Sequence, residues 1–182
     1  DQIKKTFEER KPGLQGWKTG YDLFDEKIHL VHVPHRYWAG DQVKHGVKQL
    51  RVIGGVNPDS LVSGLKFYRD LLGIPLHEVS SIEVAEMCKI TENAYRFVQI
   101  AFAEELKIIC NKTQVNFDEL RKACNTKWNI EIPEAMDGIG GHCLPKDIRY
   151  LSSLDSSNSL LLSAILVDKK YRERLNLKLK KE

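Results

Sequence analysis

The feature that most constrains this chain is a run of about 30 residues, 82–111, that contains neither glycine nor proline. Apolar residues recur along it at helical spacing, and Ser80-Ser81 followed by Glu83 forms an N-terminal capping signal. The run therefore predicts one helix about 45 Å long, at 1.5 Å per residue. Its apolar surface would lack a partner in a single chain, so we expect a homodimer through the 82–111 helix.

The segment before this helix predicts a βαβ unit. Strands are expected at 27–33, 50–53 and 74–79, and Pro75 places the last of them at a sheet edge. Asn57 and Pro58 begin a helix that ends at Gly73. Strand, helix and strand in this order favour an α/β sheet. The residues expected on the buried face of that helix are Leu61, Leu65, Tyr68 and Leu72.

The segment after the long helix predicts mostly helix. Residues 117–124 form a short helix capped by Asn116, and a glycine-rich loop leads into a helix with Pro145 in its first turn. A serine-rich linker and a basic amphipathic helix follow. The expected class is α/β followed by mostly α: an α/β sheet (1–79), a helical dimerisation domain (80–154), and a linker with a terminal helix (155–182).

Composition excludes several classes of function. The net charge of +3 is too small for a nucleic-acid footprint, and the basic residues near the end, Arg172 among them, are expected on a solvated helix face. No apolar run reaches about 18 residues and the start is charged, so we expect no membrane segment, no signal peptide and a cytoplasmic location. We expect no metal site, because alternate strand residues such as His29 and His32 face opposite ways and the cysteines lack metal-ligand spacing. Three cysteines with apolar neighbours are expected in the core: Cys88, Cys110 and Cys124.

The fourth cysteine lies in a segment rich in reactive groups, residues 138–147 with the sequence GIGGHCLPKD. Cys143 falls where the chain enters a helix, so the helix dipole and the nearby His142 and Lys146 should lower its thiol pKa. Asp147 follows one helical turn later. A thiolate beside a carboxylate suits covalent catalysis with a general base. A glycine-rich turn that holds an incidental cysteine explains the same residues.

The long helix carries a second candidate pair. Lys89 and Asn93 are four residues apart and share one helix face. An ammonium and an amide directed at one point can stabilise an oxyanion. An ordinary surface lysine accounts for Lys89 as well.

Two stretches carry a resemblance. One runs from Ala85 to Leu106 and includes KITENAYR, and the other runs from Gly138 to Leu151 and includes GIGGHCLPKD. A weaker match includes Pro34-His35-Arg36 and Gly54-Gly55. Together they resemble the middle of the UDP-glucose/GDP-mannose dehydrogenase family over residues 27 to 155. The resemblance implies oxidation of the C6 alcohol of a nucleotide sugar, with a UDP-sugar as substrate and NAD as cofactor.

The resemblance also implies roles for individual residues. Cys143 would trap the aldehyde as a thiohemiacetal, which is oxidised to a thioester. Lys89 and Asn93 would steady the C6 oxygen, Asp147 would help to activate the hydrolytic water, and Lys146 would lie near the cofactor phosphates.

Further positions follow from the same resemblance. Gly140 and Gly141 would approach the substrate, and His142 resembles the subgroup that acts on UDP-N-acetylhexosamines. Many relatives have a glutamate where this chain has His35, so a catalytic role at His35 is in doubt.

The sequence departs from the family in one large respect, since no GxGxxG motif occurs in it. The resemblance therefore implies that residues 1–79 are only the C-terminal part of a Rossmann-type NAD-binding domain. We therefore expect a truncated core that does not turn over substrate alone. One alternative is a non-catalytic dimerisation module. Another is a β-hydroxyacid-type dehydrogenase, which would use Lys89 and Asn93 but not Cys143.

Overall fold

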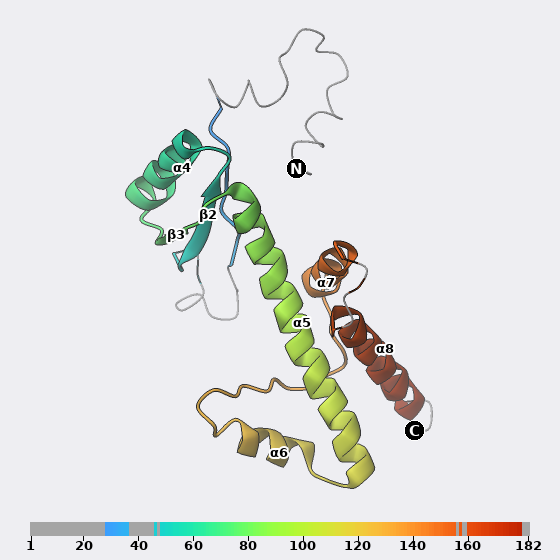
Figure 1. Ribbon diagram of the computed structural model, residues 1–182. Coiled ribbons are helices and arrows are strands. Elements are labelled where there is room, and N and C mark those ends of the chain that lie inside the picture. The colour runs from blue at the N-terminus through green and yellow to red at the C-terminus, as the bar shows by residue number, and fades with distance from the viewer. Residues whose placement is uncertain (1–27, 37–45, 47, 156, 158–159, 180–182) are drawn as a thin grey trace. The chain divides into compact units, whose positions relative to one another are not determined.

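The computed structural model describes residues 28–36, 46, 48–155, 157 and 160–179, with side chains as far as 176 (Figure 1). Lys27 and parts of the predicted linker lie outside these ranges. The chain divides into two compact units, Asp1–Lys89 and Ile90–Glu182. Each unit is described by itself.

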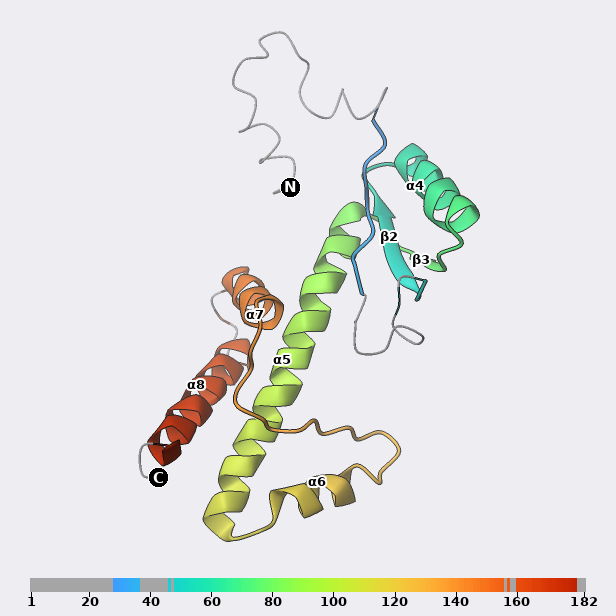
Figure 2. The same cartoon turned by 180° about the vertical axis from the view of Figure 1, so that it is seen from behind.

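The described part of the first unit is a three-stranded sheet with one helical segment against it (Figures 1 and 2). The strands are β1 (Val31–His32), β2 (Arg51–Gly55) and β3 (Leu76–Glu78), in the order β1-β2-β3. β1 pairs antiparallel with β2, and β2 pairs parallel with β3 in the register Val52 to His77. The predicted βαβ unit is thus confirmed, with its last strand at the edge.

The connection between β2 and β3 begins as α4 (Pro58–Leu65) and continues as a π-helical segment, η1 (Lys66–Leu71). Asn57 caps α4, because its side-chain oxygen accepts a 2.8 Å hydrogen bond from the Ser60 amide. Gly73 follows the helical segment, as predicted. Leu72 was predicted to be buried but is 40% exposed, since the wider π turn shifts the residues after it off the buried face.

The first strand is shorter than the predicted 27–33. Pairing lasts two residues, because β2 ends at Gly55 and the chain then turns into α4. Leu30 just before β1 is held differently: its amide donates to the Ser60 hydroxyl at 3.2 Å, and its carbonyl accepts from the Val56 amide at 3.1 Å.

Glycines let the elements of this unit approach at backbone distance. A Cβ atom added to Gly54 would lie 2.2 Å from the carbonyl oxygen of Ser81, and one added to Gly64 would lie 2.7 Å from a methyl group of Val31. Gly54 and Gly64 are buried. Any larger residue at these positions would force the sheet and its neighbours apart.

A single helix, α5 (Ile82–Thr113), spans the predicted 82–111 and two residues more. From Ile90 onward it belongs to the second unit, with α6 (Phe117–Cys124), α7 (Cys143–Ser153) and α8 (Leu160–Leu179). Asn116 caps α6 through a 3.0 Å hydrogen bond from the Glu119 amide. The predicted class, α/β followed by mostly α, is confirmed.

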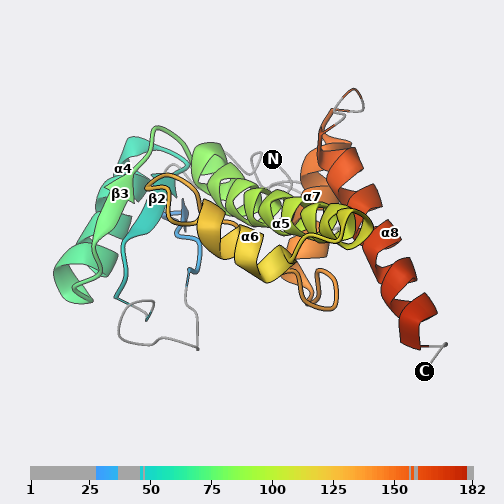
Figure 3. The ribbon, with the colours of Figure 1, turned by 90° about the horizontal axis from the view of Figure 1, so that it is seen from below.

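Two apolar clusters hold the second unit together, and Figures 1 and 3 show its helices around the C-terminal part of α5. One cluster joins α5 to α7, to α8 and to the loop before α7. The other joins α5 to α6, to the 132–135 segment and to α8. Their buried members are Ala94, Phe97, Ala101, Ile139, Ile148 and Ala164 in the first, and Ala103, Cys110, Phe117, Ile132, Ala135 and Tyr171 in the second.

The connection from α6 to α7, residues 125–142, contains turns but no helix or strand, and all of it is described. Side chains bind its backbone instead. Asn125 exchanges two hydrogen bonds with Ile132, at 2.8 and 3.0 Å. Lys107 donates to the Ala135 carbonyl at 2.8 Å, and the Tyr171 hydroxyl donates to the Met136 carbonyl at 2.7 Å.

Within the described residues, no helix is both long and apolar enough to cross a membrane.

Candidate functional site

Cys143 is the first residue of α7 and is exposed, as a reactive cysteine must be. Among the other cysteines, Cys110 is buried as predicted, whereas Cys88 and Cys124 are only partly buried. The thiol of Cys143 lies at the positive end of α7, where the first-turn N–H groups have no helical partners. The main-chain bond from the Lys146 amide to the His142 carbonyl, at 3.3 Å, begins the helix.

Asp147 lies one turn into α7 and joins the two sequence signatures in one place. Its carboxylate is 5% exposed and accepts a 2.5 Å hydrogen bond from the side-chain amide of Asn93 on α5. Its other oxygen lies 2.8 Å from the Lys146 ammonium. The hydrogen bond with Asp147 and the negative charge of that carboxylate raise the pKa of Lys146, so the ammonium stays charged at neutral pH. An amide, a carboxylate and an ammonium thus meet one helical turn from Cys143.

The remaining predicted residues have the following places. Lys89 is half-buried on α5, one turn before Asn93. Gly140 and Gly141 are exposed in the loop before α7, and no atom lies within 4 Å of where a Cβ of either would be. His35 is exposed in the first unit, after β1. The structure therefore brings Asn93, Lys146 and Asp147 into contact.

Two side chains of α8 hold the glycine loop on both sides of one residue. The Ile139 amide donates to Asp168 at 2.8 Å, and the Arg172 guanidinium donates to the Ile139 carbonyl. Arg172 Nε in turn donates to both Asp168 oxygens at 3.0 Å. We call these contacts of Asp168 and Arg172 with Ile139 the loop clamp.

The loop clamp explains one glycine of the motif. Gly138 has a φ of +94°, and a Cβ atom there would lie 2.7 Å from both Cγ and Nε of Arg172. Glycine satisfies both demands at once. Arg172 was predicted on a solvated helix face, and the structure places it on the loop instead.

Behind the loop clamp lies a buried acid. Glu104 on α5 is 0% exposed, and among the described residues no group donates a hydrogen bond to either of its carboxyl oxygens. Burial, and next the negative charge of Asp168, raise the pKa of Glu104 to about 7, against a smaller opposing effect of Arg172.

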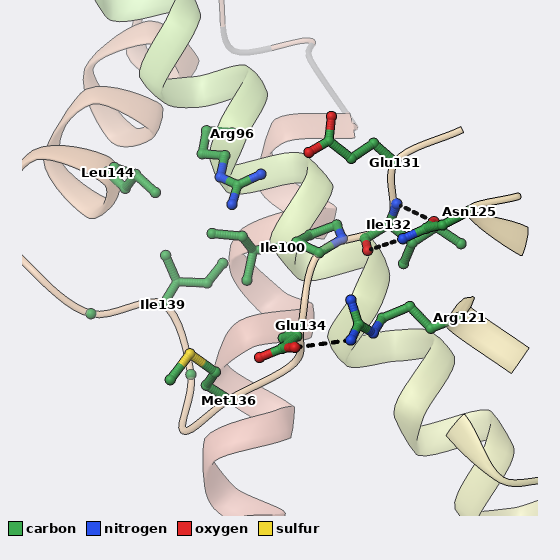
Figure 4. Close-up of a pocket in the computed structure, with 13 residues that line it drawn as sticks. Arg96, Ile100, Arg121, Asn125, Glu131, Ile132, Glu134, Met136, Ile139 and Leu144 are labelled. Carbon is green, nitrogen blue, oxygen red and sulfur yellow. Dashed lines mark hydrogen bonds and ion pairs between the residues drawn. The ribbon is translucent and has the colours of Figure 1, made fainter. Parts of the chain in front are cut away.

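A cavity of about 440 Å³ opens beside the same loop (Figure 4). The close-up shows Arg96 and Ile100 of α5 on one side and Arg121 paired with Glu134 at 2.9 Å on another. Gly138, Gly140 and Leu144 also line the cavity. The volume lies within the range of small-molecule sites, and the wall mixes apolar side chains with two arginines.

Residues 83–169 match the central domain of the UDP-glucose/GDP-mannose dehydrogenase family. The match contains both signatures and all of α5 after its first residue. Through this portion, just under half of its length, the chain is similar to that family.

The similar proteins are dehydrogenases of nucleotide sugars. The chain is 31% identical to a UDP-N-acetyl-D-mannosamine dehydrogenase of Methanococcus vannielii, over 79% of this chain and 34% of that protein. It is 37% identical to an NDP-N-acetyl-D-galactosaminuronic acid dehydrogenase of Ralstonia nicotianae, over 68% and 29%. The solved UDP-N-acetyl-mannosamine dehydrogenase of Staphylococcus aureus is 26% identical with a TM-score of 0.70, over 100% and 40%. The chain spans about a third of the length of these curated relatives.

In a Rossmann-type domain the first βα turn binds the pyrophosphate. The turn between β2 and α4 is expected in a later part of such a sheet, and its geometry does not fit a dinucleotide either. A Cβ at Gly55 would lie 2.6 Å from the Leu61 amide nitrogen and 2.9 Å from the Asn57 carbonyl oxygen, so the chain itself fills this turn. The Asn57 side chain also occupies the α4 N-terminus. This turn therefore provides no cradle for the NAD that the resemblance implies.

Sequence reasoning missed Asp168, Arg172 and the role of Glu104. Asp168 and Arg172 lie about 30 residues from Ile139 and resembled ordinary members of a charged terminal helix. Glu104 appeared only inside the α5 signature. A glutamate among apolar positions of a long helix was the one available signal.

Proposed function

We propose that this chain supplies catalytic residues of an NAD-dependent nucleotide-sugar 6-dehydrogenase, which oxidises the C6 alcohol of a UDP-sugar to a carboxylate. The observation that supports it best is the hydrogen bond between Asn93 and Asp147. It joins residues of the two signatures, 54 positions apart, within one helical turn of an exposed cysteine. The names of the relatives support a UDP-N-acetylhexosamine as the sugar.

Cys143 is the nucleophile in this scheme. Its sulfur bonds to the carbon of the C6 aldehyde and its proton passes to the aldehyde oxygen, which gives a thiohemiacetal. The hydride of the C6 alcohol would pass to one NAD, which gives the aldehyde, and the hydride of the thiohemiacetal carbon would pass to a second NAD. The hydroxyl proton passes to solvent in each oxidation, and the second oxidation leaves a thioester. Water then adds to the thioester and the thiol leaves, which releases the carboxylate.

Asp147 and Asn93 act on the oxygen atoms. Asp147 is held in place by Asn93 and Lys146, so its carboxylate can accept a proton from the attacking water. Asn93 and Lys89 share one face of α5, and their donor groups stabilise negative charge on the C6 oxygen.

The cavity beside the loop is the proposed place for part of the nucleotide sugar. Gly140, which has open space beside it, lets a ligand approach the backbone. Arg96 and Arg121 offer positive charge for an anionic group. NAD would supply the hydride acceptor, as the resemblance implies. Lys146 is the residue of this chain that would lie near its phosphates.

Protection of Cys143 tests this function without requiring turnover. The 182-residue chain is treated with iodoacetamide, with and without the 6-aldehyde of a UDP-N-acetylhexosamine, and each cysteine is followed by peptide mass spectrometry. We expect Cys143 to react faster than Cys110 and the aldehyde to slow Cys143 several-fold. Cys124 serves as the internal control. Asn93→Ala and Asp147→Asn should weaken the protection.

The contrary outcome is slow reaction at all four cysteines, or reaction of Cys143 at a rate that the aldehyde does not change. NADH formation over a panel of UDP-sugars and GDP-mannose then identifies the sugar. We expect little turnover from this chain alone, because its sequence contains no GxGxxG turn to hold the dinucleotide.

A second proposal concerns assembly, and the exposed apolar residues of α5 support it. Tyr95, Phe102 and Ile109 are exposed and spaced by seven residues, which is the repeat of a helix-pairing seam. We propose a homodimer that buries this stripe. It is compatible with catalysis and is also what a non-catalytic dimerisation module would need.

Sedimentation velocity tests the dimer. Phe102→Lys should shift the chain to monomer, because a buried pairing seam does not accommodate a charge. Lys112→Glu near the end of the same helix is the matched control and should leave the dimer intact. A monomeric wild-type chain at high concentration would contradict the proposal.

A further inference from the structure

Behind the glycine loop lie a buried acid, Glu104, and a partly buried one, Asp168, and one arrangement of their proton satisfies both groups. Glu104 is fully buried and receives no hydrogen bond from a donor among the described residues. Burial raises the pKa of Glu104, and the neighbouring carboxyl group of Asp168 raises it further, both through its negative charge and as a hydrogen-bond acceptor for the protonated acid. Two ionised carboxylates in contact would repel each other, and a fully buried ionised one without donors would be costly.

The contacts of Asp168 show which acid carries the proton. Both oxygens of Asp168 accept from Arg172, and one also accepts from the Ile139 amide. Asp168 is therefore the acceptor, and a proton between the two acids belongs to Glu104.

We propose that Glu104 is a positioning residue whose protonated carboxyl group donates to Asp168 and thereby holds the loop clamp. The loop clamp binds the peptide groups on both sides of Ile139, four residues before Cys143. The state of one proton on α5 thus controls how firmly α8 holds the loop.

Loss of that proton would weaken the loop clamp. An ionised Glu104 would repel Asp168 and attract Arg172, and these two, both on α8, are the charged groups that act on it. Arg172 would be drawn from the Ile139 carbonyl and from the space beside Gly138. Because the pKa of Glu104 is raised to about 7, the change falls near neutral pH.

Hydrogen exchange at the Ile139 amide, measured on the full chain, tests the loop clamp directly. The wild-type protection factor, corrected for intrinsic exchange, should fall about tenfold or more between about pH 6 and about pH 8. Glu104→Gln keeps a neutral donor and should retain protection at both pH values. Glu105→Gln, at the exposed neighbouring position, should behave as wild type. Glu104→Ala should lose protection at both.

A carboxyl ¹³C titration of Glu104 gives an independent readout that a purely structural role would not move. A midpoint well above 4.5 is expected, and a midpoint near 4.5 would overturn the proposal. Equal pH dependence of Ile139 exchange in wild type and Glu104→Gln would overturn it as well. Any effect of the loop clamp on the reactivity of Cys143 rests on the proposed function. Hydrogen exchange at the Ile139 amide does not. Failure of the cysteine protection assay alone would leave the loop clamp standing.

Discussion

Different interactions hold a turn in place in each of the two units. In the first unit the β2–α4 turn and its neighbours pack backbone against backbone, with Gly54 against Ser81 and Gly55 against Asn57 and Leu61. In the second unit the loop before α7 is held by polar side chains from other elements, chiefly the loop clamp. Backbone packing is fixed once the glycines are in place. A side-chain clamp depends on charge and therefore on pH, which suits a loop that precedes a reactive residue.

The largest expected effect on stability comes from comparing a buried with an exposed phenylalanine of the second unit. Phe97→Ala empties a site in the first apolar cluster, where the ring is 2% exposed, and should lower the free energy of unfolding by about 3–5 kcal/mol. Phe102→Ala on the same helix, where the ring is 55% exposed, should cost under about 0.5 kcal/mol in dilute monomer. Urea unfolding measures both, and similar costs would contradict the burial pattern.

The two units should respond to pH in opposite directions. Burial raises the pKa of Glu104 to about 7 from 4.5 for an ordinary glutamate. The stability that Glu104 contributes is therefore complete below about pH 4.5 and falls by about 3 kcal/mol as the pH rises to about 7. Burial lowers the pKa of His32 in the first unit below 6.5, against a smaller opposing effect of Glu86. Its contribution is therefore complete above pH 6.5 and declines as pH falls below that value.

Urea unfolding of Glu104→Gln and of His32→Gln at several pH values measures these two slopes. Glu104→Gln should remove the loss of stability on the alkaline side, and His32→Gln should remove the loss on the acidic side. Slopes of the same sign for both groups would break the comparison.

The glycines offer a smaller contrast. Gly54→Ala would force Ser81 away from a Cβ atom and should cost about 1–3 kcal/mol, because the clash is with backbone. Gly140→Ala meets no atom within 4 Å and should be near neutral. Thermal unfolding of the two variants measures the difference, and a cost at Gly140 equal to that at Gly54 would show that the loop is packed more tightly than described.

The smallest effects test whether the units unfold together. Asn57→Ala removes the α4 cap and Asn116→Ala removes the α6 cap, each at a cost of about 1 kcal/mol. If the units unfold separately, hydrogen exchange should rise only in the unit that lost its cap. A rise in both units after either change would mean one cooperative transition.

Local signals predicted most of the helices. The Asn57 and Asn116 caps, the Gly73 stop and the absence of helix breakers in 82–111 act over a few residues, and sequence patterns record such effects. The extent of β1 was wrong, because its pairing is limited by where a different strand ends. The π turn that exposes Leu72 was missed for a similar reason, since it follows from packing in the folded unit.

The candidate site divides in the same manner. Spacing along one helix predicted that Cys143 and Asp147 share a face of α7 and that Lys89 and Asn93 share a face of α5. The contact between Asn93 and Asp147 crosses between helices, and no spacing rule gives it. The loop clamp was missed because Arg172 packs into the space that the absent side chain of Gly138 leaves, and this space exists only in the folded chain.

Gly138 and Gly140 are two residues apart, yet they are glycine for different reasons. A side chain at Gly138 would meet Arg172 and would also have to adopt a positive φ, so a mutation at Gly138 requires Arg172 to move. Gly140 has no such correspondent within the described chain. Substitutions at Gly140 among relatives would therefore reflect a change of ligand rather than a change of fold. Position 140 would then mark relatives whose substrate has changed.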